Sequence, residues 1–294
     1  MSNDYVYNEK EKMEKRPYCL YDSSVDFENA TGGLRFYIPA DSGYVNYNLV
    51  HSVYADRNCD TWRLSMAYGL DNNLENEYPL TPHGAEWDMA LKISGRADFI
   101  GGYNHGDEVY TVVSMKIDGK STDMQCLEAI TPFNEIIVTV ESQGFDPNDS
   151  VTEALKHYKE YTINENGVTL KQRVEWLNDY TVAASYMAMM PPLKSLTDSF
   201  YTNVDRTTRV PNEHYKEEYQ NVTEAVVYGS HSGVSFSMSA PQYPSLPGGG
   251  RFFLSDNIKG LYNKMYFAIC DGAEVHRGDV WESVTQYSIS IVNS

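Results

Sequence analysis

Histidine and carboxylate side chains lie side by side in one glycine-rich segment, Gly101–Glu108, which reads Gly-Gly-Tyr-Asn-His-Gly-Asp-Glu. His105 can change its charge near neutral pH, and Asp107 and Glu108 place carboxylates beside it. Glycine lets the backbone take positive φ or approach a ligand closely. This set of residues suits acid–base chemistry on a polar ligand. His105 would be the proton donor or acceptor, and Asp107 or Glu108 would orient it or act as the partner base.

The geometry of this segment leaves two interpretations open. In an extended chain, residues 105 and 107 face one side and residue 108 faces the other. A bend at Gly106 would bring all three side chains to one mouth, whereas without that bend Glu108 is a solvated strand residue. In the second interpretation the whole segment is a tight turn whose polar residues satisfy backbone groups.

Other polar side chains are candidates for holding a ligand. Tyr103 and Asn104 belong to the same glycine-rich segment. Arg57 and Arg63 could hold a ligand carboxylate through two parallel hydrogen bonds, with surface ion pairs as the alternative. His83 begins a His-Gly-Ala-Glu sequence, for which a plain turn is the alternative to a ligand contact.

Two later strands supply the remaining candidates. Arg173 and Glu175 lie on the polar face of the expected strand 168–176, which is either a binding surface or a solvated face. Tyr186, on an apolar strand, can take part in proton transfer only if its pKa is moved from about 10. The four tryptophans occur in phase with apolar strand positions, which favours the core.

Composition excludes some classes of partner. The chain has 294 residues and a net charge of −18, from 23 basic and 41 acidic residues. Nucleic-acid binding needs a basic face, so this balance argues against a nucleic-acid partner. It argues less strongly against anionic membranes and polyanionic ligands, because a local basic patch can exist on an acidic protein.

The cysteines and the apolar runs give further limits. Cys19, Cys59, Cys126 and Cys270 are far apart and form no Cys-x-x-Cys pair, so no metal site is expected. Free buried thiols are predicted, with a disulfide pair as the alternative. No apolar run approaches the roughly 20 residues of a membrane helix. No signal peptide is visible in residues 1–16, which predicts a cytoplasmic protein, or an extracellular one if a signal was removed.

Short alternating strands with turn signals recur along the chain, and helical periodicity is nearly absent. Strands are expected at residues 34–39, 44–54, 61–68, 86–93, 107–117, 134–142, 158–163, 168–176, 180–190, 224–228, 233–238, 251–254, 264–270 and 280–292. One helical turn is expected at 151–157 and a surface loop at 239–250. This pattern is typical of an all-β fold. Residues 1–16 are predicted to be a flexible lead-in, and 17–294 a single β-sandwich domain.

Two hairpin turns are marked by their sequences. Asp118-Gly119 separates two expected strands, and so does the stretch Asn164–Gly167. Within that stretch, Asn166-Gly167 predicts a type I′ turn with both residues at positive φ.

Three segments together resemble the galactose-mutarotase-like supersandwich, a large fold of two antiparallel β-sheets. They are the His-Gly segment Gly101–Glu108, the strand and exit loop Trp176–Pro192, and the C-terminal hairpin Lys264–Trp281. The resemblance implies a sugar ligand in a cleft on one sheet and a proton-transfer role for His105. Tyr186 or Met187 stands where the family has a second histidine on its central strand.

The residues and the resemblance together predict a carbohydrate-active protein that binds a mono- or oligosaccharide. The expected reaction is epimerisation, β-elimination or hydrolysis of a sugar, none of which needs an organic cofactor. The acidity of the chain favours neutral sugars. The alternative is a non-catalytic glycan-binding or structural module, for example of a surface or phage particle. The oligomeric state is left open.

Overall fold

The computed structural model describes residues 14–24, 30–85, 87–210, 216–242, 251–256, 260–268 and 272–292. Strands dominate these ranges, and their one α-helix is the four-residue α1 (Gly102–His105). The predicted all-β class is therefore confirmed. None of the helices in these ranges has the length and apolar character needed to span a membrane.

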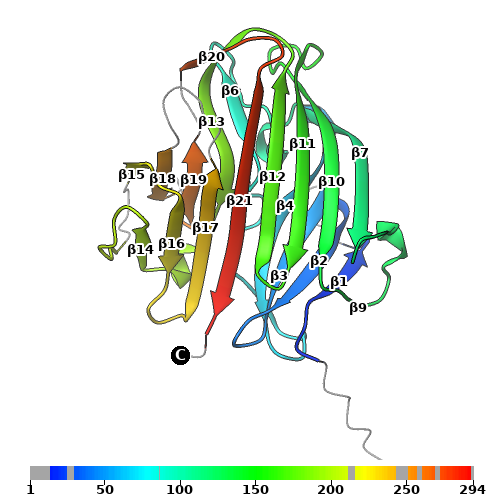
Figure 1. Ribbon diagram of the computed structural model, residues 1–294, viewed down its shortest axis with the longest axis vertical. Helices are drawn as coiled ribbons and strands as arrows, with labels where there is room; N and C mark the ends of the chain where they lie inside the picture. Colours follow the sequence, from blue (N-terminus) through cyan, green and yellow to red (C-terminus); the bar gives the residue numbers. More distant parts are fainter. Residues whose placement is uncertain are drawn as a thin grey trace, which may run out of the picture.

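The strands form two sheets (Figure 1). The larger has fifteen strands, in the order β14 (Ser199–Thr202), β16 (Glu224–Tyr228), β17 (Val234–Gln242), β21 (Val280–Ile291), β12 (Gly167–Trp176), β11 (Glu153–Asn164), β10 (Ile136–Phe145), β7 (Glu108–Ile117), β4 (Cys59–Leu70), β3 (Tyr44–Tyr54), β2 (Ala30–Pro39), β1 (Tyr18–Asp22) and β9 (Thr131–Pro132), with β5 (Glu77–Pro79) beside β4 and β8 (Lys120–Ser121) beside β7. The smaller has six, in the order β15 (Lys216–Gln220), β18 (Arg251–Asp256), β19 (Asn263–Ala268), β13 (Tyr180–Met190) and β20 (Ala273–Val275), with β6 (Ala90–Ile93) beside β13.

The larger sheet folds back on itself where β7 meets β4. This contact is parallel and joins only Cys59 to Glu108 and Asp60 to Val109, whereas the other strand pairs are antiparallel. In Figure 1, β17, β21, β12, β11, β10 and β7 stand side by side in front, and β2, β3 and β4 lie behind them. A large apolar cluster lies between the layers and includes Phe36 and Leu49 from behind and Leu170 from in front. A second cluster surrounds Trp176 and Trp281. The predicted two-sheet sandwich is confirmed.

From Leu155 onwards, strand β11 alternates between buried residues and residues that are exposed or half-buried. Leu155, His157, Lys159, Tyr161 and Ile163 are buried, and the residues between them are exposed or half-buried. The prediction of a helical turn at 151–157 is wrong, because Leu155 and His157 already follow the two-residue period of the strand. Two basic side chains, His157 and Lys159, thus point into the interior of the sandwich.

The two predicted hairpin turns differ in outcome. Asp118 and Gly119 connect β7 to β8 with φ of 47° and 78°, the backbone of a type I′ turn. The type I′ prediction for Asn166-Gly167 is wrong: only Gly167 has positive φ, at 109°. The turn lies one residue earlier in the chain than predicted. This position is favoured because the side chain of Asn164 accepts a hydrogen bond from the backbone N–H of Asn166 (2.9 Å).

Some predicted segments lie partly or wholly outside the described residues. Residues 1–13 of the predicted lead-in lie outside them, as do 243–250 of the predicted loop, whereas 239–242 belong to β17. Cys19 and Cys59 are free and buried as predicted, but Cys126 is free and exposed. Cys270 lies outside the described residues.

Gly167 should be more sensitive to substitution than Gly119, although both have positive φ. A Cβ at Gly167 would lie 2.3 Å from the carbonyl oxygen of Tyr287, whereas a Cβ at Gly119 meets nothing within 4 Å. Gly119→Ala should therefore cost only backbone strain, about 1–2 kcal/mol. We expect Gly167→Ala to cost about 1–3 kcal/mol more, because the Tyr287 backbone must shift. Urea unfolding of both variants measures the difference, and equal losses would contradict the close contact.

Candidate functional site

Close backbone packing shapes the segment that carries His105. Gly101 and Gly106 flank α1 with φ of 105° and 81°. A Cβ at Gly106 would lie 2.1 Å from the carbonyl oxygen of Arg57, and one at Gly101 would lie 2.6 Å from that of Met89. Only glycine fits both positions, so the chain must bend on either side of α1.

His105 is held by a carboxylate and packs on an aromatic ring. Its Nδ1 lies 2.7 Å from Oδ1 of Asp98, and its ring centroid lies 4.6 Å from that of Phe99. Because a carboxylate only accepts, Nδ1 donates the hydrogen bond. Burial acts to raise the pKa of Asp98, but hydrogen bonds from the Phe99 backbone and from His105 outweigh it and hold this pKa below its usual value. Asp98 was not among the residues predicted from the sequence.

Phe99 begins a cluster of half-buried rings that we call the aromatic row: Phe99, Tyr186, Phe253 and Tyr266. Tyr186 of β13 stacks on Phe99 (6.2 Å) and on Phe253 of β18 (6.4 Å), and its ring lies 5.1 Å from that of Tyr266 in β19. Strand pairing in the six-stranded sheet brings these rings together, since Phe253 is directly opposite Tyr266. Tyr186 and His105 therefore belong to one continuous surface.

The predicted partners Asp107 and Glu108 do not join His105. Asp107 is buried, has φ of 51°, and donates its backbone N–H to the carbonyl of Arg57 (2.8 Å). Burial raises the pKa of the Asp107 carboxyl. Glu108 starts β7 with its side chain in the interior of the sandwich, 1% exposed. The bend at Gly106 thus separates these side chains from His105 rather than gathering them at one mouth.

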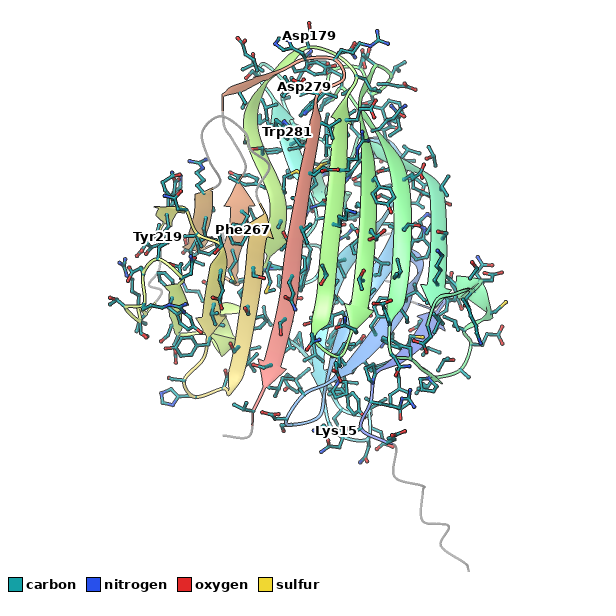
Figure 2. The ribbon with its side chains drawn as sticks, viewed as in Figure 1. Lys15, Asp179, Tyr219, Phe267, Asp279 and Trp281 are labelled. Carbon is teal, nitrogen blue, oxygen red and sulfur yellow. The ribbon has the colours of Figure 1, made fainter. Side chains whose placement is uncertain are left out.

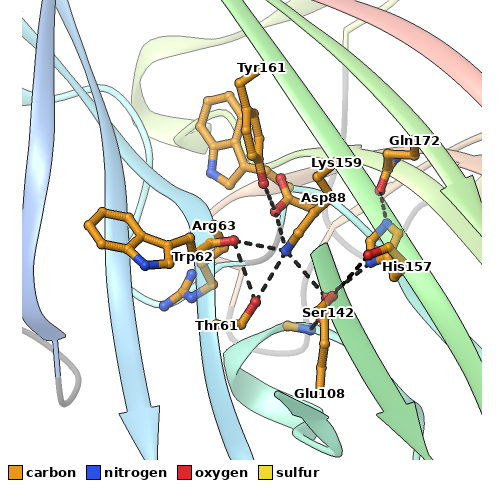
Figure 3. Close-up of polar contacts among 12 residues, drawn as sticks. Thr61, Trp62, Arg63, Asp88, Glu108, Ser142, His157, Lys159, Tyr161 and Gln172 are labelled. Atoms are coloured by element: carbon orange, nitrogen blue, oxygen red, sulfur yellow. Dashed lines mark hydrogen bonds and ion pairs between the residues drawn. The ribbon is translucent and has the colours of Figure 1, made fainter. Parts of the chain in front are cut away.

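Glu108 belongs to a buried polar network around the ammonium group of Lys159 (Figure 3). Lys159 Nζ donates to the carbonyl oxygen of Trp62 (2.8 Å) and to Oγ1 of Thr61 (3.2 Å). It also lies 3.3 Å from Oε1 of Glu108 and 3.7 Å from Oδ2 of Asp88. The side chains of Lys159 and Glu108 are 1% and 2% exposed, so these partners replace the water that the ions have lost.

Four further side chains complete the network. Ser142 Oγ donates to Oε1 of Glu108 (2.6 Å), and Nδ1 of His157 lies 3.0 Å from the same oxygen. On its other side, Nε2 of His157 lies 3.1 Å from Oε1 of Gln172. Tyr161 Oη donates to Oδ2 of Asp88 (2.5 Å). A sign of this buried network in the sequence is Gln172, a polar residue that falls in phase with the apolar residues of its strand.

The two carboxyl groups of the network have opposite pKa shifts. Burial acts to raise the pKa of Glu108, but the charge of Lys159 and the hydrogen bonds from His157 and Ser142 outweigh it and hold this pKa well below its usual value. For Asp88, burial dominates and raises the pKa. Glu108 is thus the carboxylate that balances the charge of Lys159.

Glu108 also connects this interior network to α1. Its Oε2 accepts a hydrogen bond from the backbone N–H of Gly102 (3.3 Å), the first residue of the helix. The next residue, Tyr103, stacks on Tyr54 (5.7 Å) and receives the guanidinium of Arg63 over its ring (5.0 Å). Asn104 donates its side-chain N–H to the carbonyl of Gly84 (2.5 Å). These contacts fix α1 on the body of the protein.

The remaining predicted residues lie apart from one another. Arg63 is buried and donates to the carbonyl of Ala85 (3.5 Å), next to the turn that holds the exposed His83. Arg57 is exposed, with its guanidinium 5.3 Å from the centre of the Tyr54 ring. The described residues include no group of three His, Cys, Asp or Glu placed to hold a metal ion.

Arg173 and Glu175 form an ion pair of 3.2 Å on the outer face of β12. The residues between and beside them, Gln172, Val174 and Trp176, are fully buried on the inner face. Because successive strand residues point to opposite faces, Arg173 and Glu175 point away from the interior network. They are carried by the larger sheet, and Tyr186 by the six-stranded one.

Removing the charge of Glu108 should destabilise the protein strongly. Glu108→Gln leaves the buried ammonium of Lys159 without its nearest carboxylate, a loss of about 3–5 kcal/mol for a buried pair. Glu175→Gln is the matched control, because its exposed pair with Arg173 is worth only about 0–1 kcal/mol. Urea unfolding at neutral pH compares the two, and similar losses would mean that the Lys159 charge is balanced by other groups.

The cost of Glu108→Gln should depend on pH. The pKa of Glu108 is lower in the folded chain than in the unfolded chain. Its carboxylate therefore stabilises the fold above its unfolded pKa of about 4.3, and this stability is lost as the pH falls towards the folded pKa. The difference in melting temperature between the wild type and Glu108→Gln should be widest near about pH 6 and shrink towards about pH 3. A difference that stays constant would contradict the lowered pKa.

Comparisons by sequence give no family: no protein-family model matches the chain, and no curated protein matches it. Comparison by structure does find similar folds. A galactose mutarotase-like protein from Clostridium acetobutylicum has a TM-score of 0.51 at 9% identity, over 95% of this chain and 100% of that one.

Two α-galactosidases of the GH36 class share the fold over part of their length. AgaB from Geobacillus stearothermophilus has a TM-score of 0.50 at 10% identity, and a variant of AgaA from the same organism, solved in complex with raffinose, has 0.51 at 9%. Each match covers 86% of this chain but only 40% of the α-galactosidase. Identities this low concern the fold alone. With its two packed, mainly antiparallel sheets, the chain adopts the galactose-mutarotase-like β-supersandwich fold.

Proposed function

We propose that this protein binds a carbohydrate along the aromatic row and that His105, oriented by Asp98, moves a proton to or from the bound sugar. The observation that carries the proposal is the hydrogen bond of 2.7 Å between His105 Nδ1 and Asp98 Oδ1, next to Phe99 and Tyr186. It unites an acid–base group with a half-exposed aromatic surface.

The chemistry of the surface fits a sugar. Sites for small molecules combine apolar and aromatic side chains with a few well-placed polar groups. The rings of the aromatic row can cover the apolar face of a sugar, and the hydroxyl groups of Tyr186 and Tyr266 can bond to its polar edge. The side chain of His105 is 27% exposed, so a ligand on the row can reach it.

The His105–Asp98 pair is suited to proton transfer. A neighbouring carboxylate orients the imidazole and stabilises the imidazolium that forms when the histidine accepts a proton. Epimerisation, β-elimination and hydrolysis of a sugar each need such a transfer at a sugar carbon or oxygen. The solved proteins of this fold include one called galactose mutarotase-like and an α-galactosidase in complex with raffinose, which agrees with a sugar ligand.

One observation favours a second candidate, a glycan-binding module without catalysis. The sequence predicted that Glu108 would work beside His105, but the Glu108 carboxylate lies in the interior, 3.3 Å from Lys159 Nζ. A carboxylate that balances a buried ammonium is not available as a partner base at the surface. In this alternative the aromatic row binds a sugar and His105 only contributes a hydrogen bond.

His105→Ala separates the two candidates. If His105 transfers the proton, turnover should fall by about 10²–10⁴-fold. The melting temperature should change little, because a partly exposed side chain fills no core volume. Turnover is measured on a glycan panel by reducing-sugar release, unsaturated-uronate absorbance and anomer exchange.

The matched control is His276→Ala. His276 also lies near an aspartate, Asp179, at 3.7 Å, but its side chain is 69% exposed. Asp179 lies at the upper end of the molecule in Figure 2. This control should keep full turnover. Sugar binding with no turnover in the wild type would select the binding module, and an active His105→Ala variant would remove His105 from the catalytic role.

A further inference from the structure

The outer face of the larger sheet carries a hollow that the proposed function does not use. It lies over β10, β11 and β12, which stand together in the front layer of Figures 1 and 2. The residues that line it include Glu141, Gln143, Lys156, Tyr158, Lys171 and Arg173. Its volume of about 570 Å³ is in the range of small-molecule sites.

The two-residue period of the strands places these side chains together. Lys156 and Tyr158 alternate with the buried His157 on β11, and Lys171 and Arg173 alternate with the buried Gln172 on β12. The strand register sets Tyr158 directly opposite Arg173. Lys156 is then diagonal to Arg173 across the pair of strands, within reach of a shared ligand.

Cationic side chains gather in this hollow although the chain as a whole has a net charge of −18. Three of its lining residues are cationic and one, Glu141, is acidic. Glu175 lies directly opposite Lys156 across the strands, but its carboxylate is paired with Arg173. Neither Lys156 nor Lys171 forms an ion pair with any residue in the described part of the chain. Arg173 is bound through Nη1 to Glu175 (3.2 Å), which leaves further N–H groups of its guanidinium to donate.

The nearest carboxylate opposite Lys171 is already engaged. Glu160 faces Lys171 across the strands, but its Oε2 accepts a hydrogen bond from Tyr158 Oη (2.8 Å). Burial and the charge of Glu160 raise the pKa of Tyr158 to about 12, so its hydroxyl stays protonated and keeps this bond at neutral pH. The ammonium of Lys171 therefore lacks a bonded partner within the sheet.

We propose that this hollow binds a sugar unit that carries a carboxylate or phosphate group. The anionic group lies between Lys156, Lys171 and Arg173 over β11 and β12, where charge-assisted hydrogen bonds hold it. The hydroxyl-bearing part lies towards β10 and β7, where Glu141 and Gln143 offer hydrogen-bonding groups. A bare polyanion would meet the carboxylate of Glu141, so a ligand with both parts fits better. This inference is independent of the aromatic row and of His105.

Calorimetric titration of the full chain tests the proposal with three probes: trigalacturonate, glucose 6-phosphate and the neutral trisaccharide raffinose. The test variant is the double substitution Lys156→Gln, Lys171→Gln. Its control is Lys116→Gln, Lys120→Gln, which removes the same charge from exposed lysines outside the hollow. A third variant, Tyr186→Ala, alters only the aromatic row.

The wild type should bind at least one acidic probe, and the preferred probe tells a carboxylate from a phosphate ligand. The test variant should bind that probe about tenfold or more weakly, since two charge-assisted hydrogen bonds are lost. The Lys116/Lys120 control and Tyr186→Ala should bind it as the wild type does. Raising the salt from about 50 to 300 mM should weaken this binding, because exposed charges are screened.

Three results would overturn the proposal. Neither acidic probe binds the wild type, or the control double variant loses as much affinity as the test variant, or Tyr186→Ala abolishes the binding that the test variant retains. The last result assigns the acidic sugar to the aromatic row instead. Raffinose binding that is lost in Tyr186→Ala and kept in the test variant concerns the proposed function alone.

Discussion

The buried ammonium of Lys159 is the constraint on which the interior of this sandwich depends. An ammonium without water costs several kcal/mol unless charges and hydrogen bonds replace the water. Here the replacements come from separate parts of the chain: Thr61 and the Trp62 carbonyl on β4, Glu108 on β7, and Asp88 before β6. Strand β4 lies behind β11 in Figure 1, so one side chain of the front layer is bonded to the layer behind it.

Glu108 connects the buried ammonium of Lys159 to helix α1. One oxygen of its carboxylate faces Lys159 and the other accepts from the backbone of Gly102. The carboxylate is therefore committed to two tasks, balancing charge and fixing the start of α1. His105, at the other end of the same helix, is left to pair with Asp98 instead. His105 thus pairs with Asp98 and not with Glu108, because the Glu108 carboxylate balances the charge of Lys159.

Much of the fold could be predicted from the sequence, because alternation and turn chemistry are local. Most of the long strands, the Asp118-Gly119 hairpin and the bends at the glycines of Gly101–Glu108 follow from neighbouring residues, whereas the short strands β1, β14, β15 and β20 were not predicted. The site depends on contacts between distant residues and was less predictable. Tyr186, for example, reaches Phe99 because β13 pairs with β6 and Leu91 of β6 is bridged to Ile100.

The interior network was missed for a different reason. The strand expected at residues 158–163 leaves out His157, whereas the strand that begins at Glu153 places His157 with Lys159 and Tyr161 on the buried face. Gln172 was visible among apolar neighbours, but its partners on other strands were not.

The same constraint extends through the sheet to its outer face. Shifting β11 by one residue would turn Lys159 into solvent and bring Tyr158 inward, because neighbouring residues face opposite sides. The network therefore fixes the register of β11 against β10 and β12, and Gln172, bonded to His157, fixes that of β12. Once these registers are set, Lys156, Lys171 and Arg173 must converge on the outer surface. A buried charge, held by its interior partners, thus determines where these exposed charges lie.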